Sequence, residues 1–126
     1  MKLDFDCIRD VLLTVESKAE ITDRFTYKGV KLNEVIAELP QYSSQDVFYT
    51  AQKLEEAKLI TIYRESGLRL APNDFSIVDI TYEGHQYLNS VRDNSVWSKV
   101  KSSAKSLTIP VVTKIAEKIL LANICG

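Results

Sequence analysis

The only histidine of the chain, His85, follows Thr81-Tyr82-Glu83-Gly84, a segment in which acid-base chemistry could be arranged. An imidazole exchanges protons near neutral pH, but catalysis also needs a nucleophile or a second oriented group. Glu83 and Asp79 supply no nucleophile, and the sequence has no glycine-rich phosphate loop. We therefore favour a structural interpretation, in which Gly84 lets the start of a helix pack closely against a wing and His85 is partly buried and hydrogen-bonded. No enzymatic activity is predicted.

The two cysteines, Cys7 and Cys125, lack the paired spacing of a zinc site, and one histidine does not complete such a site. Cys7 is expected to lie off the apolar face of its helix, without a histidine to activate it, as an inert flanking residue. A bridge between the two cysteines stays open as a less favoured alternative. Asp4, Asp6 and Asp10 either bind a divalent cation weakly or, as we favour, form a solvated cluster at a helix start. No metal and no cofactor are predicted.

A helix expected over residues 43–57 carries a polar outer face that could bind a partner. In a DNA-reading protein, glutamines on such a face could pair with adenine, while tyrosine, lysine and arginine side chains reach phosphates. The candidate nucleic-acid or partner face comprises Gln45, Tyr49, Gln52 and Lys53 on the helix, with Arg64 and Arg69 on the neighbouring wing.

The charge of this helix argues against DNA. Residues 43–58 carry three acidic and two basic side chains, a net charge of −1. DNA affinity comes mainly from the neutralisation of phosphates, for which this segment supplies too little positive charge. A protein partner is therefore favoured over DNA, and both alternatives stay open.

The candidate residues are positioned by a predicted order of helices and short strands. Apolar spacing and capping residues indicate helices over residues 4–18, 32–39, 43–57 and 82–92, and further helices from about 94 and from about 108. Short strands are expected over 29–31, 59–64 and 75–80, the last two pairing antiparallel around turn signals at 65–67 and 72–74. The polar stretch 20–28 carries no predicted element. This order is the winged-helix plan, an α+β fold with a three-helix core, a small antiparallel wing sheet and a C-terminal helical extension.

Composition and charge favour a small protein of the cytoplasm. The 126 residues are 45% apolar and 26% charged, as in a globular domain, and the net charge of −1 predicts no general attraction to nucleic acid or membranes. Early acidic residues exclude a secretory signal, and no apolar stretch approaches the ~20 residues of a membrane span. Residues 1–93 hold 11 basic and 16 acidic side chains, whereas residues 94–126 hold five lysines and one glutamate. We expect a winged-helix domain over 1–93 and a basic helical extension over 94–126 packed on it.

The last expected helix has an apolar stripe that a soluble chain does not leave in water. The stripe consists of Val112, Ile115, Ala116 and Ile119, opposite Lys114 and Lys118. It packs either on the chain's own first helix, which we favour because Trp97 and Val100 turn the preceding helix inward, or on a second copy. The chain is accordingly a monomer or a homodimer.

Segments 4–13, 54–60 and 80–88 are similar to a known family, and the third, Ile-Thr-Tyr-Glu-Gly-His-Gln-Tyr-Leu, is the most specific. They resemble the domain of unknown function 2513, an uncharacterised family of Gram-positive bacteria and their phages, whose typical form there reads Leu-Thr-Trp-x-Gly-His-x-Phe-Leu. The resemblance spans roughly residues 3 to 120. It implies a winged-helix-like fold and a phage or prophage setting, and no site residue, because the family has no established activity. Tyr82 stands for the usual Trp, Thr50 for a His and Lys58 for a Gly, so the third helix is expected to end differently here.

The function predicted from the sequence is that of a small cytoplasmic phage-type adaptor or regulator, which binds a protein partner without catalysis. The alternative is a winged-helix DNA-binding transcriptional regulator.

Overall fold

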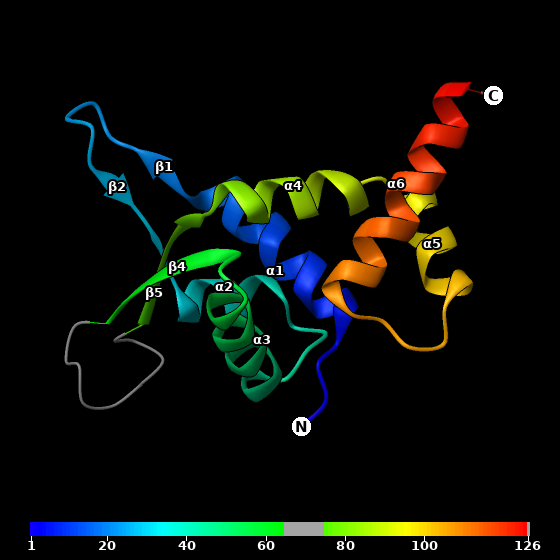
Figure 1. Cartoon of the computed structure of the whole chain (residues 1–126). Helices are drawn as coiled ribbons and strands as arrows, with labels where there is room; N and C mark the ends of the chain where they lie inside the picture. Colours follow the sequence, from blue (N-terminus) through cyan, green and yellow to red (C-terminus); the bar gives the residue numbers. More distant parts are fainter. Residues whose placement is uncertain (65–74, 126) are drawn as a thin grey trace. The chain divides into compact units, whose positions relative to one another are not determined.

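The computed structural model describes residues 1–64 and 75–125, with side chains up to residue 122 (Figure 1). It is a mixed α+β protein with small antiparallel sheets. Two compact units, Met1–Gly84 and His85–Gly126, divide within helix α4 (Tyr82–Val91), whereas the charge pattern suggested a boundary after residue 93. The turn signals at 65–67 and 72–74 and the candidate Arg69 lie outside the described residues.

The first helix, α1 (Phe5–Lys18), begins where its capping residue predicts. Oδ1 of Asp4 accepts hydrogen bonds from the backbone N–H groups of Asp6 and Cys7 at 2.9 and 3.3 Å. The expectation that Cys7 lies off the buried face was wrong: its side chain is fully buried. Because α1 packs against both helix α3 (Ser44–Glu56) and strand β5 (Phe75–Ile80), its buried stripe is wider than one row of apolar residues.

A three-stranded antiparallel sheet closes the first unit, as predicted for 59–64 and 75–80. Strand β5 is central, between β3 (Val30–Lys31) and β4 (Ile60–Arg64). Ile77 lies opposite Val30 on one side and Ile62 on the other, and the register of β4 shifts at a bulge between Thr61 and Ile62. Helices α1, α2 (Leu32–Glu38) and α3 contact this sheet, and Val30, Ile77 and Ile80 are buried beneath them.

Both ends of α3 are fixed by local hydrogen bonds. Oγ of Ser43 accepts from the Asp46 N–H at 3.1 Å, which is the predicted N-cap. At the other end Lys58 takes the left-handed conformation, φ 63°, and its N–H donates to Glu55 O while the Leu59 N–H donates to Leu54 O, both at 2.9 Å. This is the Schellman arrangement that a glycine usually provides. The expectation of a different helix end was wrong, because lysine is accommodated in the same conformation.

A β-hairpin over residues 20–28 was not predicted. Strands β1 (Glu20–Ile21) and β2 (Tyr27–Lys28) pair antiparallel, and the Phe25 N–H donates to Thr22 O at 2.8 Å. Phe25 has a φ of 62°, which gives the pattern of a three-residue hairpin loop closed by a left-handed residue. Figure 1 shows this hairpin extending away from the three-stranded sheet.

The second unit is helical. Asp93 caps helix α5 (Asn94–Ser103), and α5 packs against α6 (Ile109–Cys125). Trp97 is buried, as are Val112 and Ala116 of the predicted stripe, while Ile115 and Ile119 are half-buried. None of the helices within the described residues is long and apolar enough to cross a membrane.

Candidate binding surfaces

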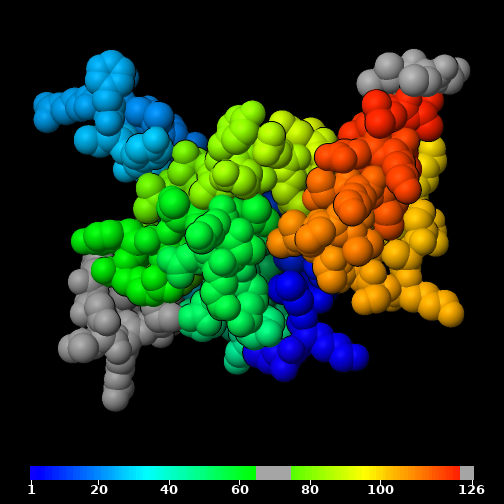
Figure 2. Space-filling model, in the orientation of Figure 1, coloured from blue at the N-terminus to red at the C-terminus, as the bar shows by residue number. Residues whose placement is uncertain are grey.

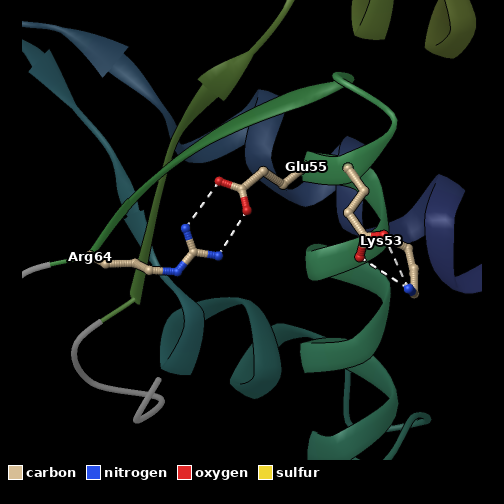
Figure 3. A network of polar contacts seen from close by, with 4 residues as sticks. Lys53, Glu55 and Arg64 are labelled. Atoms are coloured by element: carbon tan, nitrogen blue, oxygen red, sulfur yellow. Dashed lines mark hydrogen bonds and ion pairs between the residues drawn. The ribbon is translucent and has the colours of Figure 1, made fainter. Parts of the chain in front are cut away.

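The predicted face of α3 is formed by residues that the helix period brings to one side. Gln45 is exposed, and Tyr49, Gln52 and Lys53 are half-buried. The side-chain amine of Lys53 lies 5.4 Å from the centre of the Tyr49 ring. Arg64 lies at the end of β4 and contacts Glu55, on the side of α3 away from Lys53 (Figure 3). The structure therefore brings Tyr49 and Lys53 together, whereas it places Arg64 on another side of α3.

Arg64 is held by an acid of α3 (Figure 3). Its guanidinium donates to both carboxylate oxygens of Glu55, from Nη2 at 2.8 Å and from Nη1 at 3.2 Å, and it stacks 5.4 Å from the centre of the Phe75 ring. The hydrogen bond to Glu55 raises the pKa of Arg64 above its usual value. A two-pronged pair of this kind fixes the planar guanidinium in one orientation, so this arginine is directed at α3 and away from an external phosphate.

Lys53 is paired as well. Its Nζ lies 3.0 and 3.2 Å from the two carboxylate oxygens of Glu56, one turn further along α3, and this hydrogen bond raises the pKa of Lys53. Both cations of the described face are therefore neutralised by acids of the same helix, and Asp46 adds a further negative charge. The face presents amides and one tyrosine without a positive field.

The segment around His85 has the structural role that we predicted for Gly84. The hydroxyl of Thr81 donates to Lys58 O at 2.7 Å and accepts from the Gly84 N–H at 3.0 Å, while the Thr81 N–H donates to Leu59 O at 3.0 Å. A Cβ atom at Gly84 would collide with the backbone oxygen of Leu59. His85 itself is half-buried. Thr81 and Gly84 thus join the start of α4 to the end of α3.

The cysteine and the acidic residues of α1 also have structural partners. Cys7 is a free thiol that accepts a hydrogen bond from the hydroxyl of buried Thr50 at 3.3 Å, and burial raises its pKa to about 11. Asp10 accepts a hydrogen bond of 2.7 Å from the Tyr42 hydroxyl. No group of three potential metal ligands occurs within the residues that the structure describes.

A second surface, at the base of the β1–β2 hairpin, was not predicted from the sequence. The hairpin exposes 58% of Ile21, 88% of Phe25 and 59% of Tyr27. Figure 2 shows the hairpin standing out from the remainder of the first unit. At its base lies a groove of about 370 Å³, which we call the hairpin groove, lined by Tyr27, Lys28, Gly29, Lys31, Glu34, Tyr63, Ser76 and Val78.

One signal in the sequence could have revealed this surface. Ile21, Phe25 and Tyr27 are apolar residues within a stretch otherwise rich in charge, and they have neither the helical period nor a strand of ordinary length. Isolated apolar residues in a polar stretch are exposed unless a distant element covers them. Here no covering element is present among the described residues, and all three side chains stay exposed.

Fold and surfaces define a small α+β protein with two candidate binding faces. The family model described as "Hypothetical protein (DUF2513)" matches residues 2–110, so the chain belongs to this family, the domain of unknown function 2513. An "Uncharacterized protein" of Haemophilus influenzae (strain ATCC 51907 / DSM 11121 / KW20 / Rd) is 28% identical over 126 residues, which cover 95% of this chain and 96% of the relative. No solved structure is significantly similar to the chain.

Proposed function

We propose that the chain is a winged-helix protein-interaction module of the cytoplasm, an adaptor or regulator that acts by binding and not by catalysis. The order of helices α1 to α3 and of the sheet β3-β5-β4 supports a winged-helix assignment, with β4 and β5 flanking the wing. In such a protein α3 occupies the position of the helix that reads DNA.

The observation that carries this proposal is the pairing of both cations on the α3 face. Lys53 is engaged by Glu56 and Arg64 by Glu55, so a phosphate would have to displace a carboxylate at each position. Without a net positive charge there is little counterion release, and this release supplies most of the non-specific affinity for DNA. Exposed aromatic residues elsewhere on the same unit favour a protein partner.

The experiment measures binding of the full chain to a labelled random duplex by fluorescence anisotropy, at about 50 mM and about 200 mM salt. We expect no binding at either concentration. Glu55→Gln/Glu56→Gln releases both cations and should produce weak, salt-sensitive binding. The matched control Glu83→Gln/Glu117→Gln removes the same charge at two positions that form no ion pair among the described residues, and should not produce such binding. Salt-sensitive binding by the unaltered chain would overturn the proposal.

A DNA-binding transcriptional regulator is the second candidate, because exposed Gln45 and half-buried Gln52 offer amide groups that suit adenine. If this alternative holds, a selection from a pool of random DNA duplexes should yield one sequence that the chain binds specifically. This specific binding is then lost in Gln45→Ala/Gln52→Ala while the melting temperature is unchanged.

A further inference from the structure

The tip of the β1–β2 hairpin holds an aromatic side chain in an unfavourable backbone conformation. Phe25 has a φ of 62° and 88% of its surface is exposed. A left-handed conformation is unfavourable for a bulky residue and easy for glycine. The tip is nevertheless well defined, because the Thr22 N–H donates to Thr26 O at 2.9 Å and the two threonine hydroxyls lie 2.6 Å apart. A hydrogen-bonded loop thus presents an apolar ring to solvent in a backbone conformation that is unfavourable for phenylalanine.

The hairpin groove is formed on the outer face of the three-stranded sheet. Lys31, Ser76 and Tyr63 lie opposite one another across β3, β5 and β4, and form one row of its floor. Gly29 brings the chain so close to β5 that a Cβ atom there would lie 2.6 Å from Ile77 O. Tyr27, at the root of the hairpin, and Tyr63 are both more than half exposed and give the groove two aromatic walls. A groove of about 370 Å³ has room for an aromatic side chain.

The charges of the tip and of the groove are complementary. The tip carries Asp23 and Arg24 beside Phe25, and the groove carries Lys31 and Glu34. The side chains of these four charged residues form no ion pair or hydrogen bond within the described part of the chain. Lys28, by contrast, is already 3.5 Å from Glu20 at the hairpin base. The tip therefore offers an acid, a base and an aromatic ring. The groove offers the complementary set, which is a base, an acid and two aromatic rings.

We propose that two copies of this chain associate through their hairpins, which lie antiparallel so that Phe25 of each copy enters the hairpin groove of the other. Asp23 of one copy pairs with Lys31 of the other, and Arg24 pairs with Glu34. Each contact occurs twice, as a two-fold interface requires, and the arrangement closes at two copies. Each buried aromatic side chain removes about 150–250 Å² from water, so the interface is of the small class typical of weak dimers.

The second copy suits this groove better than an anionic ligand does. The lining contains Glu34 beside Lys31, and Lys28 is neutralised by Glu20, so the groove has no net charge to attract a phosphate chain. An acidic or a basic peptide would leave either Glu34 or Lys31 opposed by a like charge. The hairpin tip supplies both signs and the ring together. The inference goes beyond the proposed function and is independent of the DNA experiment.

The first experiment is sedimentation velocity of the full chain over a concentration series. We expect a monomer–dimer equilibrium with a Kd of about 1–100 µM. Phe25→Gly should weaken the dimer at least tenfold and leave the melting temperature equal or higher, because glycine suits the left-handed position. The matched control Tyr82→Ser removes another exposed aromatic side chain, 75% exposed and outside the groove, and should leave the equilibrium unchanged.

The second experiment reverses charges. Lys31→Glu places three acids at the contact and should weaken the dimer several-fold, as should Asp23→Lys. The double variant Asp23→Lys/Lys31→Glu restores opposite signs and should recover most of the affinity of the parent, which a merely structural effect of either substitution would not produce.

Three results would overturn the inference. One is a chain that stays monomeric up to several hundred micromolar. Another is a dimer that is insensitive to Phe25→Gly but lost in Leu121→Ser, since Leu121 is 60% exposed on α6 and would then mark a dimer of the C-terminal helices. The third is a double charge variant that is weaker than both single variants. None of these results bears on DNA binding, so failure here is distinct from failure of the proposed function.

Discussion

Cys7 shows how burial sets the chemistry of a single residue. Its side chain has no exposed surface, and burial raises the thiol pKa from 9.0 to about 11. Since the thiolate is the reactive form, native Cys7 is an inert thiol at neutral pH. Inertness is what the sequence suggested, but the reason is different: the residue lies inside the core and does not flank it.

The raised pKa predicts a loss of stability in alkali. The unfolded state releases the Cys7 proton around pH 9.0, whereas the folded state keeps it up to about pH 11. The contribution of the protonated thiol to the free energy of unfolding is therefore fully present below pH 9.0 and is lost as the pH rises towards about 11. The difference of about two pKa units corresponds to about 2–3 kcal/mol. Urea unfolding at a series of pH values should show a steeper alkaline decline for the parent than for Cys7→Ala. Parallel curves would contradict the assignment.

Two buried or partly buried tyrosines form a matched pair for measuring one hydrogen bond. Tyr42 donates to Asp10 at 2.7 Å, whereas the buried hydroxyl of Tyr87 has no partner within the described residues. Tyr42→Phe removes a hydrogen bond to a charged group and should lower the free energy of unfolding by about 1.5–3 kcal/mol. Tyr87→Phe should leave it unchanged or raise it slightly. Denaturant unfolding measures both, and equal effects would show that loss of a hydroxyl alone explains the result.

At the scale of elements, the sequence predicts what local patterns determine. Ser43 and Asp4 indicate the starts of α3 and α1, and the β-branched run near Ile60 predicts β4. The hairpin at 20–28 escaped prediction because each strand has two residues and its turn lacks the usual glycine or asparagine. Its pairing depends on the geometry of the loop, which composition does not reveal.

The candidate face, too, was predictable where it depends on local sequence and not where it depends on tertiary contact. The helical period places Gln45, Tyr49 and Gln52 together, and the i,i+3 spacing of Lys53 and Glu56 already indicates an ion pair. The pair between Arg64 and Glu55 joins a strand to a helix, and it depends on how β4 runs beside α3. Tertiary contact therefore changed the interpretation of Arg64 from a free cation to a bound one.

The end of α3 offers a substitution that stabilises. Lys58 has a φ of 63°, a conformation that costs a side-chain-bearing residue about 1–2 kcal/mol. Lys58→Gly should raise the free energy of unfolding by about 1 kcal/mol, since glycine is less strained there but loses more entropy on folding. Thermal unfolding checks this, with Ala57→Gly as the control at an ordinary right-handed position, φ −77°, where glycine should destabilise.

The junction between α3 and α4 is expected to be intolerant of any side chain at residue 84. In Gly84→Ala, the added methyl group meets the backbone of Leu59 and the Ile80 side chain, so the start of α4 has to shift. We expect a loss of about 1–3 kcal/mol or more, as for other overpacked sites. Circular dichroism on heating measures it. An unchanged melting temperature would mean that this close approach is absent in solution.

At the scale of the whole molecule, the proposed dimer combines an apolar contact with exposed charge pairs, and salt separates the two. Exposed ion pairs are screened as ionic strength rises, whereas burial of Phe25 is not. Raising NaCl from about 50 mM to about 500 mM should weaken self-association several-fold in the parent and have little effect in Asp23→Asn/Arg24→Gln/Lys31→Gln/Glu34→Gln. Sedimentation equilibrium measures both, and a salt-independent parent dimer would show that the charges do not face one another.

The close approach at Gly29 packs the root of the hairpin against the central strand of the sheet. Gly29 lies so close to β5 that an added Cβ atom would meet the backbone of Ile77 and Val78, and the side chain of Ile77 is fully buried. Because the root of the hairpin packs on the central strand of the sheet, a hairpin that is held in the dimer should also restrain local opening of that strand. Docking of the tip should slow amide exchange at residues 77 and 78, far along the chain from Phe25. Dimerisation through an exposed loop would thus be detectable as slower amide exchange in a buried strand.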